Sequence, residues 1–271
     1  MFSNSSGSSP PVRAGVSKLI QILPRWWTGG TILASSFLVP ATSWALGRSG
    51  ARVWFPENLS TYGSAIDRLF TLILWITGII FVLVEGVLLI FLFRYRARSG
   101  VPATYTHGNN LIEVIWTIIP AFILVFLGFQ SQQVWSHVRG TPPPSDLEVE
   151  VMAEQFAWNI RYPGADGRFD TADDIKTINQ MHIPVNQTVL IHLKSKDVIH
   201  SFFLPHFRIK QDAVPGITGH LWLEATKVAN VEIVCAELCG LGHYRMRGFL
   251  TIESPEAFRD WLAQALKEQQ S

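Results

Sequence analysis

Two long apolar segments constrain this chain more than any other feature of its sequence. Residues 69–93 contain one charged residue, Glu85, and residues 114–134 contain none. A helix needs about 20 apolar residues to cross a bilayer, and both segments reach that length. A buried globular helix is the alternative for one such segment, but two in tandem favour a membrane hairpin. We therefore expect two spanning helices, the second of which tolerates Pro120 inside the membrane.

The loop between the two segments sets their orientation. It begins Arg94-Tyr-Arg-Ala-Arg-Ser-Gly, and the positive-inside rule places its three Arg in the cytoplasm. Everything before residue 69 and after residue 134 then faces the outer side. Residues 1–140 hold 10 Lys+Arg and 4 Asp+Glu, so this part has a positive net charge. Residues 141–271 hold 12 Lys+Arg and 17 Asp+Glu, so this part has a negative net charge. The net charge of +1 over the whole chain gives no sign of a nucleic-acid partner.

A third, shorter apolar stretch lies near the N-terminus, at residues 28–46, after three basic residues. Ser43 and Ala45 have the small side chains that precede a signal-peptide cleavage site. We expect residues 1–45 to be a signal peptide, with a retained third span as the alternative. The remaining expected divisions are an outer segment at 46–68, the membrane hairpin at 69–135, a Pro-rich linker at 136–146 and an outer domain at 147–271.

Beyond residue 147 the sequence changes to short stretches with apolar side chains at every second position. This alternation predicts half-buried strands, and about 110 residues of this kind predict a β-sandwich or barrel. After them, Ser254 as N-cap, Pro255 and an apolar helical face predict a short C-terminal helix. The predicted fold class is a membrane-anchored all-β protein, a two-helix hairpin followed by a β-sandwich. The predicted strands are residues 147–151, 156–162, 188–193, 221–223, 231–235 and 249–252.

The twelve residues from Cys235 to Met246 combine two thiols, the imidazole of His243 and a thioether. A further imidazole, His200, lies between two predicted strands. Soft sulfur and nitrogen ligands select copper, and two His, one Cys and a weak axial Met form the blue-copper set. Because this chain has a second thiol, Cys239, two thiolates can bridge two metal atoms. A Cys235–Cys239 disulfide and a Cys₂His₂ zinc site are the alternatives, but neither explains Met246.

On these residues the chain resembles cytochrome c oxidase subunit 2, the copper-bearing subunit of haem–copper terminal oxidases. The resemblance covers about residues 69–266. Besides the copper loop, it includes the strings Glu113-Val-Ile-Trp-Thr-Ile-Ile-Pro, Asp197-Val-Ile-His-Ser-Phe and Lys210-Gln-Asp-Ala-Val-Pro-Gly. It implies a cupredoxin-like outer domain that holds CuA, a centre of two copper atoms. The implied ligands are the side chains of His200, Cys235, Cys239, His243 and Met246 and the backbone carbonyl of Glu237.

The resemblance also implies a function. CuA accepts electrons from cytochrome c and passes them to haem in subunit 1, where oxygen is reduced to water with proton pumping. The side chain of Glu237 is expected to help hold magnesium at the subunit 1 interface, and Glu113 to lie at the mouth of a proton pathway. The implied partners are subunit 1, other oxidase subunits and a cytochrome donor. The implied location is a bacterial-type inner membrane with the copper domain on the periplasmic side.

Two other functions stay open at this point. One is the CuA subunit of a nitric oxide reductase, because the chemistry that separates the two enzymes lies in another subunit. The other is a membrane-tethered copper protein without turnover. Glu85, inside the first predicted span, has no assigned role.

The expected route of electron entry departs from the family pattern. The family usually has a Trp in a Gln-Trp-x-Trp string, where this chain has Gln155-Phe-Ala-Trp. Phe156 therefore marks the expected docking surface and leaves the donor open, and Trp158 is either core or part of the route. Acidic residues that follow are expected to steer a cationic donor, with a calcium loop or a merely solvated loop as alternatives. These residues are Asp166, Asp170, Asp173 and Asp174.

Overall fold

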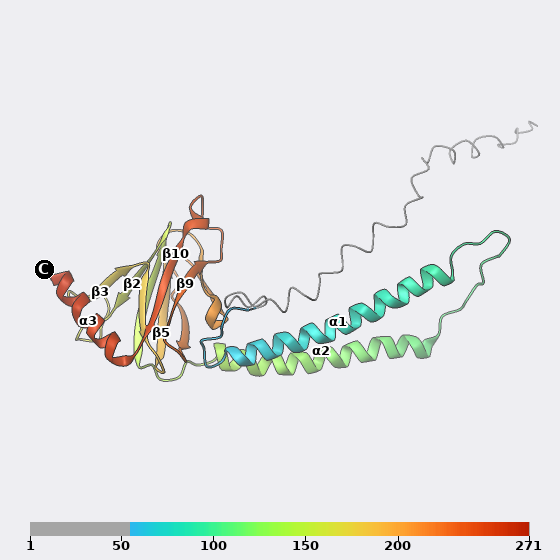
Figure 1. Cartoon of the computed structure of the whole chain (residues 1–271), viewed down its shortest axis with the longest axis horizontal. Coiled ribbons are helices and arrows are strands. Elements are labelled where there is room, and N and C mark those ends of the chain that lie inside the picture. The colour runs from blue at the N-terminus through green and yellow to red at the C-terminus, as the bar shows by residue number, and fades with distance from the viewer. Residues whose placement is uncertain (1–54, 271) are drawn as a thin grey trace, which may run out of the picture. The chain divides into compact units, whose positions relative to one another are not determined.

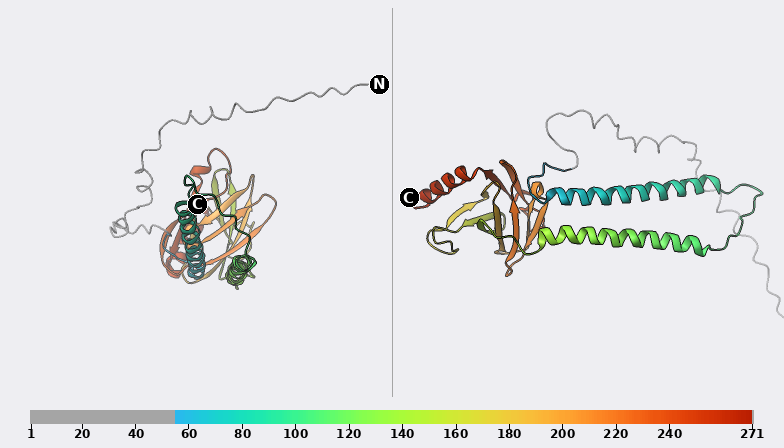
Figure 2. Two further views of the ribbon diagram at one scale, coloured as in Figure 1. Left: turned by 90° about the vertical axis from the view of Figure 1, so that its right-hand side faces the viewer. Right: turned by 90° about the horizontal axis from the view of Figure 1, so that it is seen from below.

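The computed structural model describes residues 55–270, and Figure 1 gives the order of the elements. Two long helices come first, α1 (Gly63–Arg94) and α2 (Asn110–Arg139). By length and composition both can cross a membrane, as the two apolar segments predict. Figures 1 and 2 show them side by side. The predicted signal peptide lies outside the described residues, and the domain boundaries stay predictions.

Local sequence accounts for the ends of the hairpin helices. The side chain of Asn109 caps α2 by accepting hydrogen bonds from the backbone N–H groups of Leu111 and Ile112, at 3.0 and 3.2 Å. Arg94 occupies the last turn of α1, where a cation is favoured by the helix dipole. Pro120 stays inside α2 without ending it.

The outer domain is a sandwich of two five-stranded sheets, as predicted. One sheet has the order β3-β2-β1-β5-β8 and the other the order β4-β10-β9-β6-β7. The strands of the first sheet are β1 (Leu147–Glu154), β2 (Ala157–Tyr162), β3 (Ile175–Ile178), β5 (Thr188–Ser195) and β8 (Gly219–Glu224). Those of the second are β4 (Gln180–Pro184), β6 (His200–Leu204), β7 (Ile209–Ala213), β9 (Ala229–Cys235) and β10 (Arg247–Glu253).

Four of these strands, β3, β4, β6 and β7, were not predicted from the alternation of apolar residues. The strand β3 is only four residues long, and β7 reads Ile-Lys-Gln-Asp-Ala with polar residues at its centre. In β6 four of five residues are buried, including His200 and Ser201, so no alternation is visible. Sheet pairing, rather than the local pattern, makes these segments strands.

The core lies between the two sheets and consists of the inward side chains of both. Trp158 on β2, Phe202 on β6, Ile191 on β5 and Leu250 on β10 are fully buried. The rings of Trp158 and Phe202 meet edge to face across the core, with centroids 5.3 Å apart, an arrangement that aromatic pairs favour. This core fixes the strands that carry the candidate metal ligands.

Strand pairing brings several chain segments to one end of the sandwich. In the antiparallel pair of β6 and β9, Phe202 lies opposite Cys235, so the start of β6 meets the end of β9. The strand β10 starts at the same end because Arg247 pairs with Val234. The hydrogen bonds of Gln155 to Asp197 and to the carbonyl of Cys239 bring the β1–β2 turn to this end as well. We call it the Cys235 end.

The C-terminal helix α3 (Pro255–Gln270) packs on the edge formed by β3, β4 and β10. As predicted, Ser254 caps it, because its hydroxyl accepts a hydrogen bond from the backbone N–H of Ala257 at 3.2 Å. The indole of Trp261 stacks on the ring of His182, with centroids 4.0 Å apart and planes 8° apart, and meets Tyr162 edge-on. Aromatic contacts thus hold α3 against the sandwich.

The segment before α1 is tied to the outer domain. The backbone N–H of Leu59 donates to the carbonyl of His206 at 3.0 Å, and the hydroxyl of the buried Tyr62 donates to the carbonyl of Trp222 at 3.2 Å. The guanidinium of Arg208 pairs with the carboxylate of Asp67 at 2.8 Å. The start of α1 is therefore held against the sandwich, and the orientation predicted from the Arg-rich loop stays a prediction.

Trp261→Ala tests the role of the aromatic contacts under α3. Because the change removes a large, partly buried ring from three aromatic neighbours, Tyr162, His182 and Phe258, we expect the free energy of unfolding of the outer domain to fall by about 3 kcal/mol. Chemical denaturation of the detergent-solubilised chain, followed by circular dichroism, measures it. Lys267→Ala, on an exposed position of the same helix, is the control, and equal midpoints for the two variants would contradict the prediction.

Candidate metal centre

The Cys235 end of the sandwich gathers the predicted ligands. Cys235 is the last residue of β9, and Met246 immediately precedes β10. The loop between them contains Cys239 and the short 3₁₀ helix η3 (His243–Arg245). In Figure 1 this connection lies at one end of the labelled strands β9 and β10. His200, the first residue of β6, reaches the same place because β6 pairs with β9.

The ligand atoms converge on a small buried volume. The sulfur atoms of Cys235 and Cys239 are 3.9 Å apart. The sulfur of Cys239 lies 3.7 Å from the thioether of Met246 and 3.7 Å from Nδ1 of His243. The nearest ligand atoms of His200, Cys235 and Cys239 all lie within 4.8 Å of one another. All predicted side-chain ligands therefore meet at one site.

The donor set fits a soft metal ion. Cys235, Cys239, Met246 and His200 are all buried. The Nδ1 atom of His200 is buried and has no hydrogen-bond partner among the described residues, which leaves its lone pair for a metal. Both thiols are free, so the disulfide alternative is absent from this structure. The Met246 thioether beside Cys239 favours copper over zinc, because thioether sulfur is a soft ligand.

The backbone of Glu237 also faces the site. The Cys235 thiol donates to the carbonyl oxygen of Glu237 at 3.3 Å, as expected for a carbonyl that supplies a further ligand. The Glu237 side chain itself is exposed. Within residues 55–270, the group of His200 and the two Cys is the one cluster of His, Cys, Asp and Glu close enough to hold a metal, so nothing here supports a magnesium site.

Asp197 orients His200 through the ring nitrogen Nε2. The carboxylate oxygen Oδ1 lies 2.8 Å from Nε2 of His200, which places the proton on Nε2 and leaves Nδ1 for the metal. Such a carboxylate behind a ligand imidazole is a common support of metal sites. Burial alone raises the pKa of Asp197, but hydrogen bonds from His200 and from the backbone of Gln155 and Val198 lower it overall, so this group is a carboxylate at neutral pH.

Burial, and then the neighbouring Cys235 thiol, raise the pKa of the Cys239 thiol to about 11. Near neutral pH the metal-free thiol therefore stays protonated. Since only the thiolate is a good ligand, a metal must displace this proton when it binds.

The two aromatic residues of the predicted electron route lie in different surroundings. Phe156 is 37% exposed and lies against the ligand loop, where a methyl group on Gly242 would come within 2.4 Å of its ring. Trp158 is fully buried in the core. Its ring centroid is 6.3 Å from that of His200. Trp158 is therefore a core residue whose ring also lies against the imidazole of His200.

The acidic loop does not lie beside Phe156. It follows Tyr162, the last residue of β2, whereas Phe156 precedes the first. A strand rises about 3.3 Å per residue, so the six residues of β2 separate the two by about 20 Å. Proximity in the sequence was misleading because an extended strand intervenes. The role of these acids in docking a donor stays a prediction.

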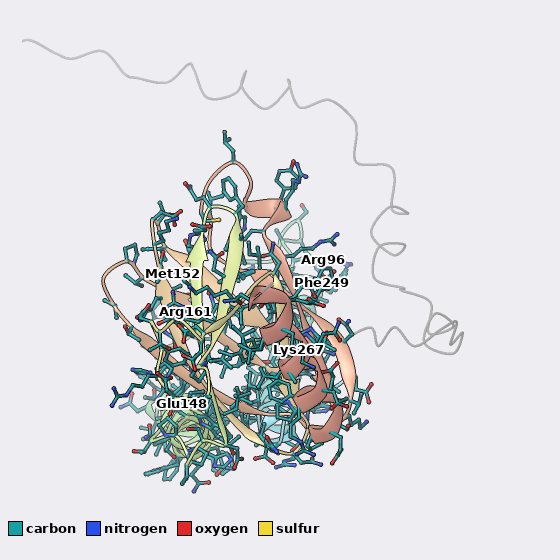
Figure 3. The ribbon with its side chains drawn as sticks, turned by 90° about the vertical axis from the view of Figure 1, so that its left-hand side faces the viewer. Arg96, Glu148, Met152, Arg161, Phe249 and Lys267 are labelled. Atoms are coloured by element: carbon teal, nitrogen blue, oxygen red, sulfur yellow. The ribbon has the colours of Figure 1, made fainter. Side chains whose placement is uncertain are left out.

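Two of the four acids, Asp170 and Asp174, lie within ion-pair distance of Arg161. Arg161, labelled on the outward face of the sheet in Figure 3, forms an ion pair with Asp170 and lies 3.7 Å from Asp174. The buried carboxylate of Asp174 accepts hydrogen bonds from the backbone N–H groups of Asp170 and Thr171. These contacts explain the shape of the loop without calcium. Asp166 accepts a hydrogen bond from the backbone N–H of Arg168 and Asp173 accepts one from the hydroxyl of Thr171, so all four acids have partners within the loop.

Sequence reasoning missed the apolar side chains around the ligand loop. Leu238, Leu241 and Tyr244 are 77%, 97% and 82% exposed. Large exposed apolar groups that cluster beside a functional site mark a contact with another protein. Their spacing in the loop is irregular, so no strand or helix pattern pointed to them.

Glu85 and Glu113, the two acidic residues singled out in the predicted membrane segments, lie apart from the metal ligands. Glu113 is in the first turn of α2, at the end that the Arg-rich loop places in the cytoplasm, and Glu85 lies within α1. Both are exposed in the isolated chain. The assignment of Glu113 to a proton pathway stays a prediction.

Comparison with known proteins gives consistent matches. Residues 42–134 match the family described as cytochrome c oxidase subunit II, transmembrane domain, and residues 148–253 match its periplasmic domain. The chain is 31% identical over 233 residues to the alternative cytochrome c oxidase subunit 2 of Bradyrhizobium diazoefficiens, covering 78% of this chain and 84% of that protein. It is 32% identical over 263 residues to cytochrome c oxidase subunit 2 of Thermostichus vulcanus, covering 77% of each.

Among solved structures, the chain is similar to the crystal structure of the periplasmic domain of subunit II of cytochrome oxidase from Bradyrhizobium japonicum. The two are 27% identical, with a TM-score of 0.43, and the match covers 47% of this chain and 99% of that one.

Gly242→Ala tests the contact between Phe156 and the ligand loop. A methyl group there would lie 2.4 Å from Cδ2 and 2.6 Å from Cγ of Phe156, so ring or loop must move. We expect a loss of about 1–3 kcal/mol in stability and weaker copper binding. Thermal unfolding and copper titration of the solubilised chain measure both effects.

A second background makes the Gly242 test specific. In a Phe156→Ala chain the same methyl group meets no ring, so Gly242→Ala should cost little. Gly219→Ala, where the nearest atom is 3.6 Å away, is the control. An equal cost of Gly242→Ala in both backgrounds would mean that the ring contact is not responsible.

Proposed function

This chain belongs to the cytochrome c oxidase subunit 2 family, and we propose that its metal centre is CuA, the copper site through which electrons enter the oxidase. In this proposal the centre takes electrons from a cytochrome c and passes them to haem in subunit 1, where oxygen is reduced to water with proton pumping. The oxygen chemistry belongs to subunit 1, and this chain supplies the entry point. Membership of the family supports the role, and the ligand geometry supports the centre.

The observation that carries the proposal is the pair of buried thiols. Cys235 and Cys239 lie 3.9 Å apart, with His243 and Met246 close to Cys239 and with His200 close to both thiols. A single copper needs one thiolate, one weak axial ligand and two imidazoles, so the second thiol suits a second copper. Cys235 and Cys239 would hold the two copper atoms together, and such a pair would share one electron, so that little geometry would change on reduction.

The protein's own residues keep this geometry fixed. The ligands come from the rigid ends of β6 and β9 and from a loop that is closed at its base, where the backbone N–H of Cys235 donates to the carbonyl of Met246 at 3.3 Å. Burial of Cys235, Cys239 and Met246 excludes water from the sulfur ligands. Ligands held in this way do not rearrange during electron transfer.

Phe156 is the electron entry point in this proposal. Its ring is partly exposed on one side and touches Gly240 and Gly242 of the ligand loop on the other. It is therefore a short path between a docked donor and Cys239. The exposed Leu241 and Tyr244 nearby provide apolar contact area for a partner protein, and Asp166 and Asp173 act only as distant charges.

We place the chain in a bacterial-type inner membrane, with the sandwich in the periplasm. The two apolar helices and the matched transmembrane and periplasmic domains support an anchored periplasmic domain. In the same proposal Glu113 lies at the cytoplasmic entrance of a proton pathway. The Glu237 side chain, which is exposed beside the metal centre, would complete a magnesium site with ligands from subunit 1.

Electron paramagnetic resonance of the full chain, solubilised in detergent and loaded with copper, tests the proposal. We expect two coppers per chain and a seven-line hyperfine pattern, because one unpaired electron is shared by two copper nuclei. A four-line pattern, or failure to retain copper, would contradict a dinuclear centre. Oxygen uptake by the purified complex with reduced cytochrome c then separates an oxidase from a nitric oxide reductase.

Met246→Leu tests the role of the thioether. Because an axial thioether tunes the potential more than it holds the metal, we expect two coppers to stay bound while the reduction potential rises. Redox titration and copper analysis measure the two quantities. Met152→Leu, on the outward face of β1 (Figure 3), is the control and should match the wild type. Loss of both coppers from Met246→Leu would instead make Met246 a primary ligand.

A further inference from the structure

The β1–β2 turn contacts the metal site from outside the ligand loop. Its two residues, Gln155 and Phe156, lie between β1 and β2, in the other sheet from β6, β9 and β10. Neither residue supplies a predicted ligand. Each nevertheless makes specific contacts with residues that carry or orient ligands, and the side chain of Gln155 has no role in the site as described so far.

The side chain of Gln155 holds the ligand loop at Cys239. Its amide Nε2 donates a hydrogen bond to the backbone carbonyl of Cys239 at 2.5 Å. This carbonyl belongs to the residue whose sulfur contacts Cys235, His243 and Met246. A hydrogen bond there restricts rotation of the Cys239 peptide, and with it the direction of the thiolate.

The backbone of Gln155 holds the other side of the site. Its N–H donates to Oδ2 of Asp197 at 2.7 Å, while Oδ1 of the same carboxylate lies 2.8 Å from Nε2 of His200. Asp197 thus uses its two oxygens to join Gln155 to a ligand imidazole. Gln155 is consequently connected to Cys239 through its side chain and to His200 through Asp197.

The ring of Phe156 and the side chain of Gln155 both lie against the glycines of the ligand loop. Phe156 fills the space that Gly240 and Gly242 leave open, since a methyl group on either glycine would come within 3.4 Å of the ring. Gly240 follows Cys239 directly and has a φ of +137°, which favours glycine. A methyl group on Gly240 would also lie 2.7 Å from Nε2 of Gln155. The turn and the loop therefore fit each other closely.

We propose that Gln155 is a positioning residue of the metal centre, which sets the relative orientation of the Cys239 and His200 ligands. This inference rests on the proposed function and extends it to a residue outside the ligand set. Hydrogen bonds to the residues that carry the ligands orient those ligands and tune the metal. The role requires the amide donor of Gln155. It is therefore lost when the amide is replaced by a group of equal length that cannot donate a hydrogen bond.

Two substitutions in the purified oxidase complex test the proposal. Gln155→Met keeps the length of the side chain without a donor, and Gln155→Glu keeps its shape but places a carboxylate against the Cys239 carbonyl. Both substitutions leave intact the hydrogen bond from the backbone N–H of residue 155 to the carboxylate of Asp197. Gln180→Met, at an exposed position on β4 in the other sheet, is the matched control.

We expect both Gln155 variants to fold. They should bind copper about 10- to 100-fold more weakly than the wild type, and their copper hyperfine splitting and reduction potential should be shifted. Circular dichroism checks the fold, and copper titration, electron paramagnetic resonance and redox titration check the rest. The control should match the wild type. A residue that only caps the turn would change stability and leave splitting and potential unaltered.

The outcomes separate this inference from the proposed function. If the wild-type complex shows the seven-line pattern and both Gln155 variants have the same splitting, potential and copper affinity, the positioning role is wrong and CuA stands. If the wild-type complex lacks that pattern, the proposed centre itself is wrong, and the role of Gln155 is wrong with it.

Discussion

The antiparallel pairing of β6 with β9 is the constraint on which the metal site depends. It places Phe202 opposite Cys235, so that His200, two residues earlier, arrives beside the thiols. A backbone hydrogen bond from Ala236 to Ser201, at 2.9 Å, continues the pairing past the end of β9. If this register changed by one residue, His200 would point to the opposite face of the sheet. The buried core beneath it, with Trp158 and Phe202 in contact, holds the register.

Charge and apolar surface occupy different parts of the outer domain. The outward face of the β3-β2-β1-β5-β8 sheet is covered by ion pairs, among which the buried Glu150 meets both Arg161 and Lys194. The acidic loop is attached to that face through Arg161 and lies far from the metal. Around the metal itself, the exposed residues include Leu238, Leu241 and Tyr244. In the proposed function, a partner that docks there would meet these apolar side chains beside the exposed Glu237 and Arg245, and the acids would act only at long range, where salt screens them.

Some parts of the structure could be predicted because their cause is local. The membrane helices follow from the length of the apolar segments, and α3 follows from Ser254, Pro255 and a helical apolar face. The ligand residues were identifiable because two Cys, a His and a Met rarely lie so close together. Strands such as β6 and β7 were not predictable, because burial of His200 and Ser201, and the polar residues of β7, conceal the alternation. The acidic loop was expected close to Phe156, and this expectation failed because a linear sequence does not show that β2 separates Asp166 from Phe156.

The kinds of ligand atoms, their order in the chain and the membrane segments could all be inferred from the amino-acid sequence, since these depend on residue chemistry and on apolar length. Three relations became visible only in the folded domain: His200 lies beside the thiols, its Nδ1 is the nitrogen without a partner among the described residues, and Gln155 contacts both Cys239 and Asp197. Those relations join residues from separate strands, including residues 84 positions apart in the case of Gln155 and Cys239. They depend on sheet pairing and core packing, which are set by the whole domain at once and which no local pattern encodes.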